Sequence, residues 1–219
     1  KISYKIQEKP EGAVHAISLA ERFINKCNVA VALGDNIFHG NDFVNLIRSA
    51  DAISKGSTVL AYPVRDPKEY GVVKFDHSGH VIDIEEKPEL PASQYAITGI
   101  YFYDNTVFQR IKELTISSRG EIEVTDLNRK YLNDKLLNVK IMGRGMAWLD
   151  AGTIDSLQEA SLYVRTLEHR QGFKVGCPEE VAWRQGWIND LQLEKLAHRL
   201  STSGYGKYLL KLLKTKYHR

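Results

Sequence analysis

The chain has 219 residues, 43% hydrophobic and 26% charged, a composition typical of a globular protein with one sizeable domain and an appended element. No apolar run approaches the roughly 20 residues of a membrane-spanning helix, and the first residues do not resemble a signal peptide. The net charge of +3 is too small to argue for a nucleic-acid partner. The two cysteines, Cys27 and Cys177, lack metal-ligand spacing, so we expect a protein of the reducing cytoplasm.

The first third of the chain alternates strand-like and helical segments. Residues 29–33 form an uninterrupted apolar run that stops at Gly34-Asp35-Asn36. Such a run, bounded by turn residues, predicts a strand buried on both faces, with Asp35 at its carboxyl end. In chain order, we expect a strand over 3–7, a helix over 13–23, this strand, a helix over 42–55 and a strand over 58–64. This order predicts an α/β fold with a mixed, mainly parallel central sheet.

The middle of the chain continues with a hairpin and a second series of helices and strands. A Gly turn between two alternating segments predicts the hairpin. The expected elements are hairpin strands over 70–76 and 81–85, a strand over 95–104, helices over 105–114 and 119–132, strands over 139–142 and 147–150, and a helix reaching residue 170.

The last fifty residues form a tail of different composition. Residues 171–184 are expected to be irregular and residues 190–200 helical. Gly204-Tyr205-Gly206 is expected to break that helix, and residues 207–216 to form a short basic amphipathic helix. Such a helix can bind a membrane or a partner, but the preferred interpretation is that it packs its leucines inward and solvates its lysines.

Three strand ends combine charged residues with turn residues. They are Gly34-Asp35-Asn36, Glu85-Glu86-Lys87-Pro88 and Trp148-Leu149-Asp150-Ala151-Gly152-Thr153. Two carboxylates from distant strand ends can hold one divalent cation and leave positions open for phosphate oxygens. A lysine beside them would neutralise a phosphate, and a glutamate beside a glycine-lined floor could bind sugar hydroxyls. Taken singly, Asp35 is equally well a helix cap, and the glutamates are more simply a solvated strand end.

These segments, in order and spacing, resemble the sugar-nucleotide pyrophosphorylases, and within them the glucose-1-phosphate thymidylyltransferases. The likeness runs through nearly the whole chain. Further segments that carry it are Asp66-Pro67-x-x-Tyr70-Gly71-Val72-Val73, Thr98-Gly99-Ile100-Tyr101-Phe102-Tyr103-Asp104, Arg119-Gly120-Glu121-x-Glu123-x-Thr125-Asp126, and Gly143-Arg144-Gly145-x-Ala147-Trp148. Around Cys177-Pro178-Glu179-Glu180 the tail looks like the short thymidylyltransferase group in particular.

The resemblance implies a Rossmann-like nucleotide-diphospho-sugar transferase fold and a reaction of dTTP with glucose 1-phosphate that gives dTDP-glucose and pyrophosphate. It assigns Mg²⁺ to Asp35 and Asp150, the sugar phosphate to Lys87, and a place near the phosphates to Arg119. These four are the expected catalytic residues. The residues it assigns to substrate binding are Gln7 and Gly12 for the base, Tyr70, Gly71, Glu86, Ile97 and Gly99 for the glucosyl side, and in addition Asn36 and Trp148.

The resemblance also implies an organisation and a setting. Residues 1–170 correspond to a nucleotidyltransferase core, and residues 171–219 to a C-terminal helical region for regulation and oligomerisation. A cytoplasmic homotetramer that serves the dTDP-rhamnose type of deoxysugar and cell-surface polysaccharide synthesis is expected.

Two departures from the family pattern stand out. The Gly-x-Gly-Thr-Arg loop after the first strand is missing, so we expect a core that is incomplete at its N-terminus. Pro10-Glu11-Gly12-Ala13-Val14-His15-Ala16 stands where the family usually has Leu-Ala-Gln after the glycine, which bears on base preference. The missing loop motivates the alternative of a non-catalytic sugar-nucleotide-binding protein or inactive fragment. A metal-dependent phosphohydrolase is disfavoured, because no general base for water is apparent.

Overall fold

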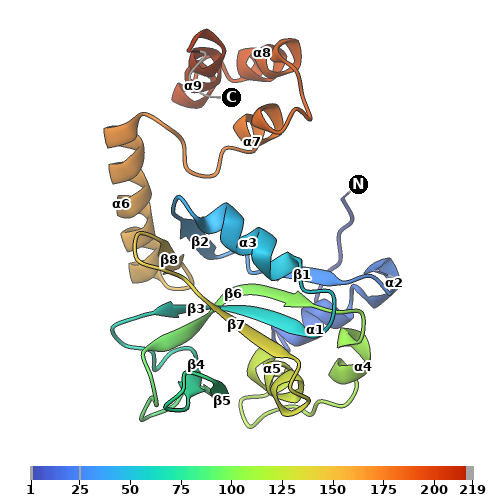
Figure 1. The fold of residues 1–219 in the computed structure, drawn as a ribbon. Helices are drawn as coiled ribbons and strands as arrows, with labels where there is room; N and C mark the ends of the chain where they lie inside the picture. Colours follow the sequence, from blue (N-terminus) through green and yellow to red (C-terminus); the bar gives the residue numbers. More distant parts are fainter. Residues whose placement is uncertain (1, 25, 216–219) are drawn as a thin grey trace. The chain divides into compact units, whose positions relative to one another are not determined.

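The computed structural model describes residues 2–24 and 26–215, and the chain divides into two compact units, Lys1–Thr153 and Ile154–Arg219 (Figure 1). The first unit contains the sheet strands. They are β1 Val29–Ala32, β2 Asn36–His39, β3 Ser57–Pro63, β4 Gly71–Phe75, β5 Val81–Glu86, β6 Tyr95–Tyr103, β7 Leu137–Ile141 and β8 Ala147–Asp150. Its helices are α1 Ala13–Ser18, α2 Glu21–Ile24, α3 Phe43–Asp51, α4 Val107–Ile111 and α5 Val124–Asn133.

The six-stranded sheet has the order β5-β4-β6-β3-β7, with β1 also beside β6, while β2 and β8 form a separate two-stranded ribbon. The α/β class and the mixed sheet are confirmed. The expectation of mainly parallel pairing is wrong, because among the described strands only β3 and β7 pair in parallel. The physical reason is β6, which runs against β1, β3 and β4 and lies between strands that would otherwise be mutually parallel.

The two edges of β6 are occupied differently. Strand β3 pairs along one edge from Ser57↔Tyr103 to Pro63↔Tyr95. The other edge is shared, since β4 pairs with it at Val72↔Ala96 and β1 begins only at Ala32↔Ile100. Residues 97–99 therefore lie where β1 and β4 diverge. A split between neighbouring strands is where open α/β sheets form ligand crevices.

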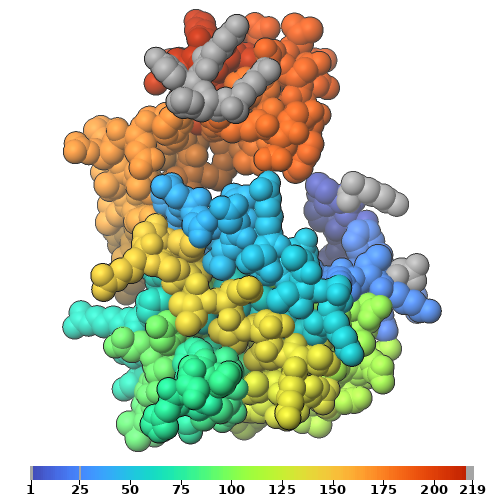
Figure 2. Space-filling view, in the orientation of Figure 1, coloured from blue at the N-terminus to red at the C-terminus, as the bar shows by residue number. Residues whose placement is uncertain are grey.

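The sheet has a hydrophobic layer on each face. Tyr101 and Tyr103 of β6 belong to the cluster that includes helices α1, α4 and α5, whereas Ala96 and Phe102 belong to the cluster that includes α3. This alternation is the period of two of a β-strand. In Figure 1 α3 lies on one side of the sheet and α5 on the other, and Figure 2 shows α3 beside the yellow segment that contains β7.

Several predicted elements in the first unit need correction. Strand β1 is not buried on both faces, because Ala30 and Ala32 are exposed and its described pairing is with β6 alone. Residues 3–7 form no strand and are largely exposed, since no described strand pairs with them. The helix expected over 13–23 is interrupted by a turn between α1 and α2. Ribbon strand β2 was not anticipated, because its partner β8 lies more than a hundred residues later.

The second unit contains α6 Ile154–Gln171, α7 Pro178–Arg184, α8 Asp190–Arg199 and α9 Gly204–Lys214. Helix α7 lies inside the stretch expected to be irregular, where Pro178 occupies its first turn. The expected break at 204–206 is wrong, because Ser203 caps α9 there. A β-carbon on Gly206 would lie 2.1 Å from the Leu200 carbonyl oxygen, so the glycine permits close packing.

Helix α9 packs as expected from its pattern. Tyr208, Leu209 and Leu212 are buried in the core of the second unit, together with Leu193 and Ala197 of α8. The end of the predicted helix at Lys216 lies outside the described residues. Across residues 2–24 and 26–215, no helix has the length and apolarity needed to cross a membrane. The functional division predicted at residue 170 stays a prediction; the compact units divide at Thr153.

Candidate active site

The β2–β8 ribbon brings two predicted metal ligands together. Asn36 pairs with Asp150, so Asp35 lies just before one strand and Asp150 ends the other. The Ala151 N–H donates to the Asp35 carbonyl oxygen at 2.8 Å. A β-carbon on Gly152 would lie 3.3 Å from one Asp150 carboxylate oxygen and 3.6 Å from one Asp35 carboxylate oxygen. The two carboxylates thus converge over Gly152.

The electrostatics of this pair suit a cation. Burial raises the pKa of Asp150, and the nearby Asp35 charge raises it further, while the Gly152 N–H and Lys87 oppose the rise. Two carboxylates that resist joint ionisation are stabilised by a divalent ion between them. Among the described residues, no three His, Cys, Asp or Glu side chains form a complete metal-ligand cluster. The pair therefore fits a hard ion such as Mg²⁺ that takes its other ligands from water and phosphate.

Asn36 ties this ribbon to the sheet. Its Oδ1 accepts hydrogen bonds from the Gly99 N–H at 3.0 Å and from Trp148 Nε1 at 2.6 Å. Its Nδ2 donates to Asp35 Oδ1 at 2.8 Å. A β-carbon on Gly99 would meet the Asn36 side chain at 2.5 Å, so a glycine is required there. Asn36 thereby orients Asp35 and Trp148.

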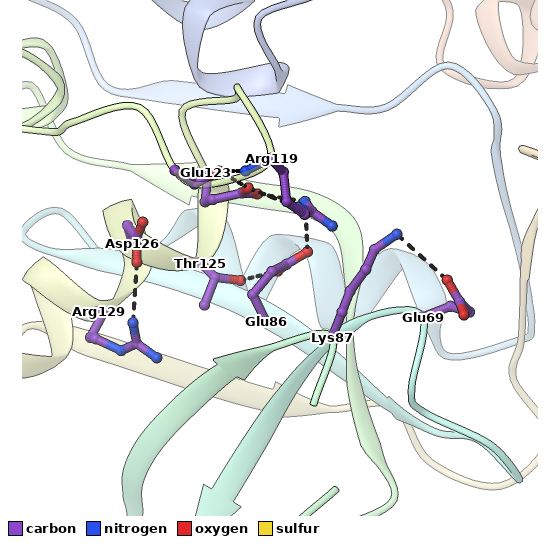
Figure 3. Close-up of polar contacts among 9 residues, drawn as sticks. Glu69, Glu86, Lys87, Arg119, Glu123, Thr125, Asp126 and Arg129 are labelled. Atoms are coloured by element: carbon purple, nitrogen blue, oxygen red, sulfur yellow. Dashed lines mark hydrogen bonds and ion pairs between the residues drawn. The ribbon is translucent and has the colours of Figure 1, made fainter. Parts of the chain in front are cut away.

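The Glu86 carboxylate forms the second polar part of the site (Figure 3). It accepts hydrogen bonds from Thr125 Oγ1 at 2.5 Å and from Arg119 Nη2 at 3.3 Å. A β-carbon on Gly71 would lie 2.9 Å from Thr125 Oγ1 and 3.4 Å from a Glu86 oxygen. Because Gly71 has no side chain, the space next to the Glu86 carboxylate stays open. The predicted glycine-lined site for sugar hydroxyls requires such a space.

Arg119 is held by a second, buried carboxylate. It contacts Glu123 twice, with Nε 3.0 Å from Oε1 and Nη2 2.8 Å from Oε2, and Ser117 also donates to Oε1. Burial works to raise the pKa of Glu123, but the hydrogen bonds from Arg119 and Ser117 outweigh it, so that pKa is lowered. The role of Arg119 near the phosphates stays a prediction, since here it binds carboxylates.

Lys87 directly follows β5 and has a left-handed backbone conformation, with φ of 43°. Its N–H donates to the Tyr70 carbonyl oxygen at 3.0 Å, and its Nζ lies 3.6 Å from Glu69, towards which the side chain points in Figure 3. Tyr70 packs edge-on against Trp148, with ring centroids 5.0 Å apart. Burial raises the pKa of Tyr70, as do the nearby Asp150 and Glu69 charges.

A cavity of about 220 Å³ joins these groups at the split between β1 and β4. Its lining contains ten of the thirteen residues predicted for the site: Asp35, Asn36, Tyr70, Gly71, Glu86, Ile97, Gly99, Arg119, Trp148 and Asp150. Lys87, Gln7 and Gly12 do not line it. Gln7 Nε2 instead donates to the Gly12 carbonyl oxygen at 3.1 Å, and the assignment of both residues to the base stays a prediction.

Some lining residues were not anticipated as site residues. Glu123 and Thr125 lie in a segment used for the family resemblance, and the four-residue spacing of Arg119 and Glu123 was the available signal for an ion pair. Tyr101 also lines the cavity, and its pKa is raised by burial and by the Glu86, Asp150 and Asp35 charges. In sequence it is one aromatic among several in an apolar strand, so nothing distinguished it from a core residue.

Comparison with known proteins shows to which class of enzyme the chain belongs. The family described as nucleotidyl transferase matches residues 1–166, which makes the chain a nucleotidyltransferase. The glucose-1-phosphate thymidylyltransferase of Neisseria meningitidis is 48% identical over 97% of this chain and 74% of its own length. That of Mycolicibacterium smegmatis is 50% identical over 97% and 73%. The chain belongs to the glucose-1-phosphate thymidylyltransferase family.

Solved structures agree with this placement. A Bacillus anthracis protein described as a glucose-1-phosphate thymidylyltransferase, solved in complex with sucrose, matches with 42% identity and a TM-score of 0.67. The match covers 74% of this chain and 65% of that chain. A UDP-glucose pyrophosphorylase complexed with UDP-glucose matches with a TM-score of 0.66, covering 75% of this chain and 66% of that one; at 24% identity it supports the fold alone.

Proposed function

We propose that this chain carries out thymidylyl transfer from dTTP to α-D-glucose 1-phosphate, giving dTDP-glucose and pyrophosphate, with Mg²⁺ held by Asp35 and Asp150. The observation that carries the proposal is the convergence of these two carboxylates beside Gly152, in the lining of a cavity that also contains Glu86 and Thr125. The names of the relatives support the choice of nucleotide and sugar.

The chemistry needs little covalent participation from the protein. An oxygen of the sugar phosphate attacks the α-phosphorus of dTTP, a new P–O bond forms, and the bond to the β-phosphate oxygen breaks as pyrophosphate leaves. Because the attacking phosphate oxygen already carries negative charge, no general base is required. When bound, Mg²⁺ would supply positive charge to the nucleotide phosphates.

The residues of the chain then act by positioning and by charge. Lys87, whose Nζ lies 3.6 Å from the exposed Glu69, is available to a phosphate as a point charge. Glu86 accepts hydrogen bonds, which suits sugar hydroxyls, and Asn36 orients Asp35. Holding nucleophile and phosphorus in line is the main source of rate in such reactions.

The test is pyrophosphate release by the 219-residue chain with Mg²⁺, glucose 1-phosphate and each nucleoside triphosphate in turn. Release with dTTP above the other triphosphates is expected. No release with any triphosphate, from this chain or from one extended to the full length of its relatives, would contradict the proposal.

A second candidate is binding of a sugar nucleotide without turnover. The contacts of Arg119 favour it, since this guanidinium binds Glu86 and Glu123, whereas turnover would need its charge at the phosphates. Tight binding of dTDP-glucose with no pyrophosphate release in the same assay would select this candidate.

The wider setting is also proposed. Two free cysteines support a cytoplasmic location. By family resemblance, the protein acts as a homotetramer, its C-terminal helices serve regulation and assembly, and its product feeds deoxysugar synthesis of the dTDP-rhamnose type. Size-exclusion chromatography with light scattering tests the assembly; a monomer at micromolar concentration would contradict it.

A further inference from the structure

Asn128 is a buried amide in the wall of the cavity. It lies on α5, one turn after Thr125, and is 1% exposed. Residues three apart on a helix share a face, so Asn128 follows Thr125 along the side of α5 that faces the site. Both residues line the cavity, but only Thr125 contacts Glu86 there.

One end of the Asn128 amide is fixed by the protein. The hydroxyl of Tyr103, a residue that is 2% exposed, donates to Asn128 Oδ1 at 2.9 Å. Burial holds the pKa of Tyr103 well above its usual value, so this hydroxyl keeps its proton and stays a donor. The hydrogen bond orients the amide, with its oxygen towards Tyr103.

The other end of the amide has no acceptor among the described residues. Asn128 Nδ2 is buried and makes no hydrogen bond with that part of the chain. Leaving a buried donor unpaired costs about 1–3 kcal/mol, so such a group calls for an explanation. A ligand oxygen in the cavity would supply the missing acceptor.

From this geometry we infer that Asn128 is a specificity-determining residue whose Nδ2 donates to a hydroxyl oxygen of the hexose bound in the cavity. The inference rests on the proposed function and deepens it. The hexose would then be held by an acceptor, Glu86, and by a donor, Asn128, which face the same cavity. A pocket with both kinds of partner discriminates sugars by the position of their hydroxyl groups.

Two substitutions separate this role from a structural one. N128L removes the unpaired donor together with the acceptor for Tyr103, and N128D keeps the acceptor but replaces the Nδ2 donor with a carboxylate oxygen. A matched control is T58V, because Thr58 Oγ1 on β3 is likewise buried and unpaired among the described residues but lies outside the cavity lining.

The readout is calorimetric binding of dTDP-glucose and of dTDP, with Mg²⁺, to the 219-residue chain. N128L and N128D are each expected to weaken dTDP-glucose about tenfold, the loss of one hydrogen bond, and to leave dTDP unchanged. T58V is expected to change neither affinity. N128L also takes the acceptor from the buried Tyr103 hydroxyl, so its melting temperature is expected to fall by a few degrees, and all affinities are compared at a temperature where every variant is folded.

Mono-deoxy analogues of dTDP-glucose identify the hydroxyl. The analogue that lacks the contacted hydroxyl is expected to bind the unsubstituted chain more weakly than dTDP-glucose does. Its affinity for N128L is expected to equal its affinity for the unsubstituted chain. Three results would overturn the inference and leave the proposed function intact. The first is an unchanged affinity for dTDP-glucose in N128L or N128D, and the second is an equal loss of affinity for dTDP. The third is that N128L weakens the binding of every deoxy analogue as much as it weakens the binding of dTDP-glucose. Failure of the unsubstituted chain to bind dTDP-glucose at all would instead overturn the proposed function and this inference with it.

Discussion

The cavity contains two pairs of carboxylates, and the negative charge of each pair is compensated in a different way. Glu86 and Glu123 share the Arg119 guanidinium and accept further hydrogen bonds from Thr125 and Ser117. Asp35 and Asp150 face each other, with hydrogen bonds from the neutral donors Asn36 and Gly152. The pKa of Glu123 is accordingly lowered and that of Asp150 raised.

Glu86 and Glu123 therefore have their positive partner within the chain, whereas Asp35 and Asp150 need a cation that the chain does not supply. A carboxylate paired by an arginine stabilises the fold as it stands, whereas two carboxylates held together oppose folding until a cation binds. The predictions below test that contrast, beginning with Lys87, whose charge acts on both Glu123 and Asp150.

The largest expected effect belongs to Lys87. K87A is expected to weaken glucose 1-phosphate binding about 10- to 100-fold, because a charge-assisted contact to phosphate is worth about 1.5–3 kcal/mol. Calorimetry measures it, with K74A, an exposed lysine on β4, as the matched control. Equal affinity in K87A and K74A would show that Lys87 does not bind the phosphate.

The Arg119 network is expected to support the fold. R119A should lower the free energy of unfolding by about 2 kcal/mol, because it leaves the buried Glu123 carboxylate with only its Ser117 partner. R129A is the control: Arg129 pairs with the more exposed Asp83 and Asp126 and donates to the Ile84 carbonyl oxygen, and the expected loss is about 1 kcal/mol. Denaturant unfolding of both variants measures the difference, and a larger loss in R129A would refute the assignment.

Acid stability is expected to depend on Glu123. Its lowered pKa contributes stability that is present above its usual value of 4.5 and is lost as the pH falls through the folded-state value. E123Q should therefore lose less stability than the unsubstituted chain between about pH 5 and pH 3, by on the order of 1 kcal/mol. Urea unfolding across that range checks the slope, and parallel curves for the two proteins would contradict the prediction.

Asp150 is expected to show the opposite sign. Its raised pKa contributes stability below the usual value of 3.8 that is lost as the pH rises through the folded-state value. Without metal at pH 7, D150N should therefore melt slightly higher than the unsubstituted chain, by on the order of 2 °C. A clearly lower melting temperature for D150N would mean that the carboxylate is structural.

The local parts of the fold could be predicted from sequence, and the distant pairings could not. The hairpin of β4 and β5 and the long strand β6 follow from alternation, apolar runs and turn residues, which are local signals. Strand β2 owes its existence to β8, and the direction of β6 is set by three neighbours. Pairing between strands that are distant in sequence produces no hydrophobic periodicity in either strand from which the partner could be predicted.

The site shows the same division. That Asp35, Glu86 and Asp150 line one cavity could be predicted, because charged residues at the ends of apolar strands are unusual and the family resemblance groups them in one site. Asn128 could not be identified, because an asparagine within a helix has no pattern that distinguishes it from a solvated one. Its significance comes from burial and from the Tyr103 hydrogen bond, which only the folded chain shows.

The central claim is that Asp35 and Asp150 form a divalent-cation site for a nucleotide sugar. The most direct measurement is the affinity for dTDP-glucose with and without Mg²⁺, in the unsubstituted chain, in D150A, and in D51A, which removes an exposed carboxylate on α3. The account predicts that Mg²⁺ strengthens binding at least tenfold in the unsubstituted chain and in D51A, and has no effect in D150A. An equal Mg²⁺ effect in all three proteins would contradict it.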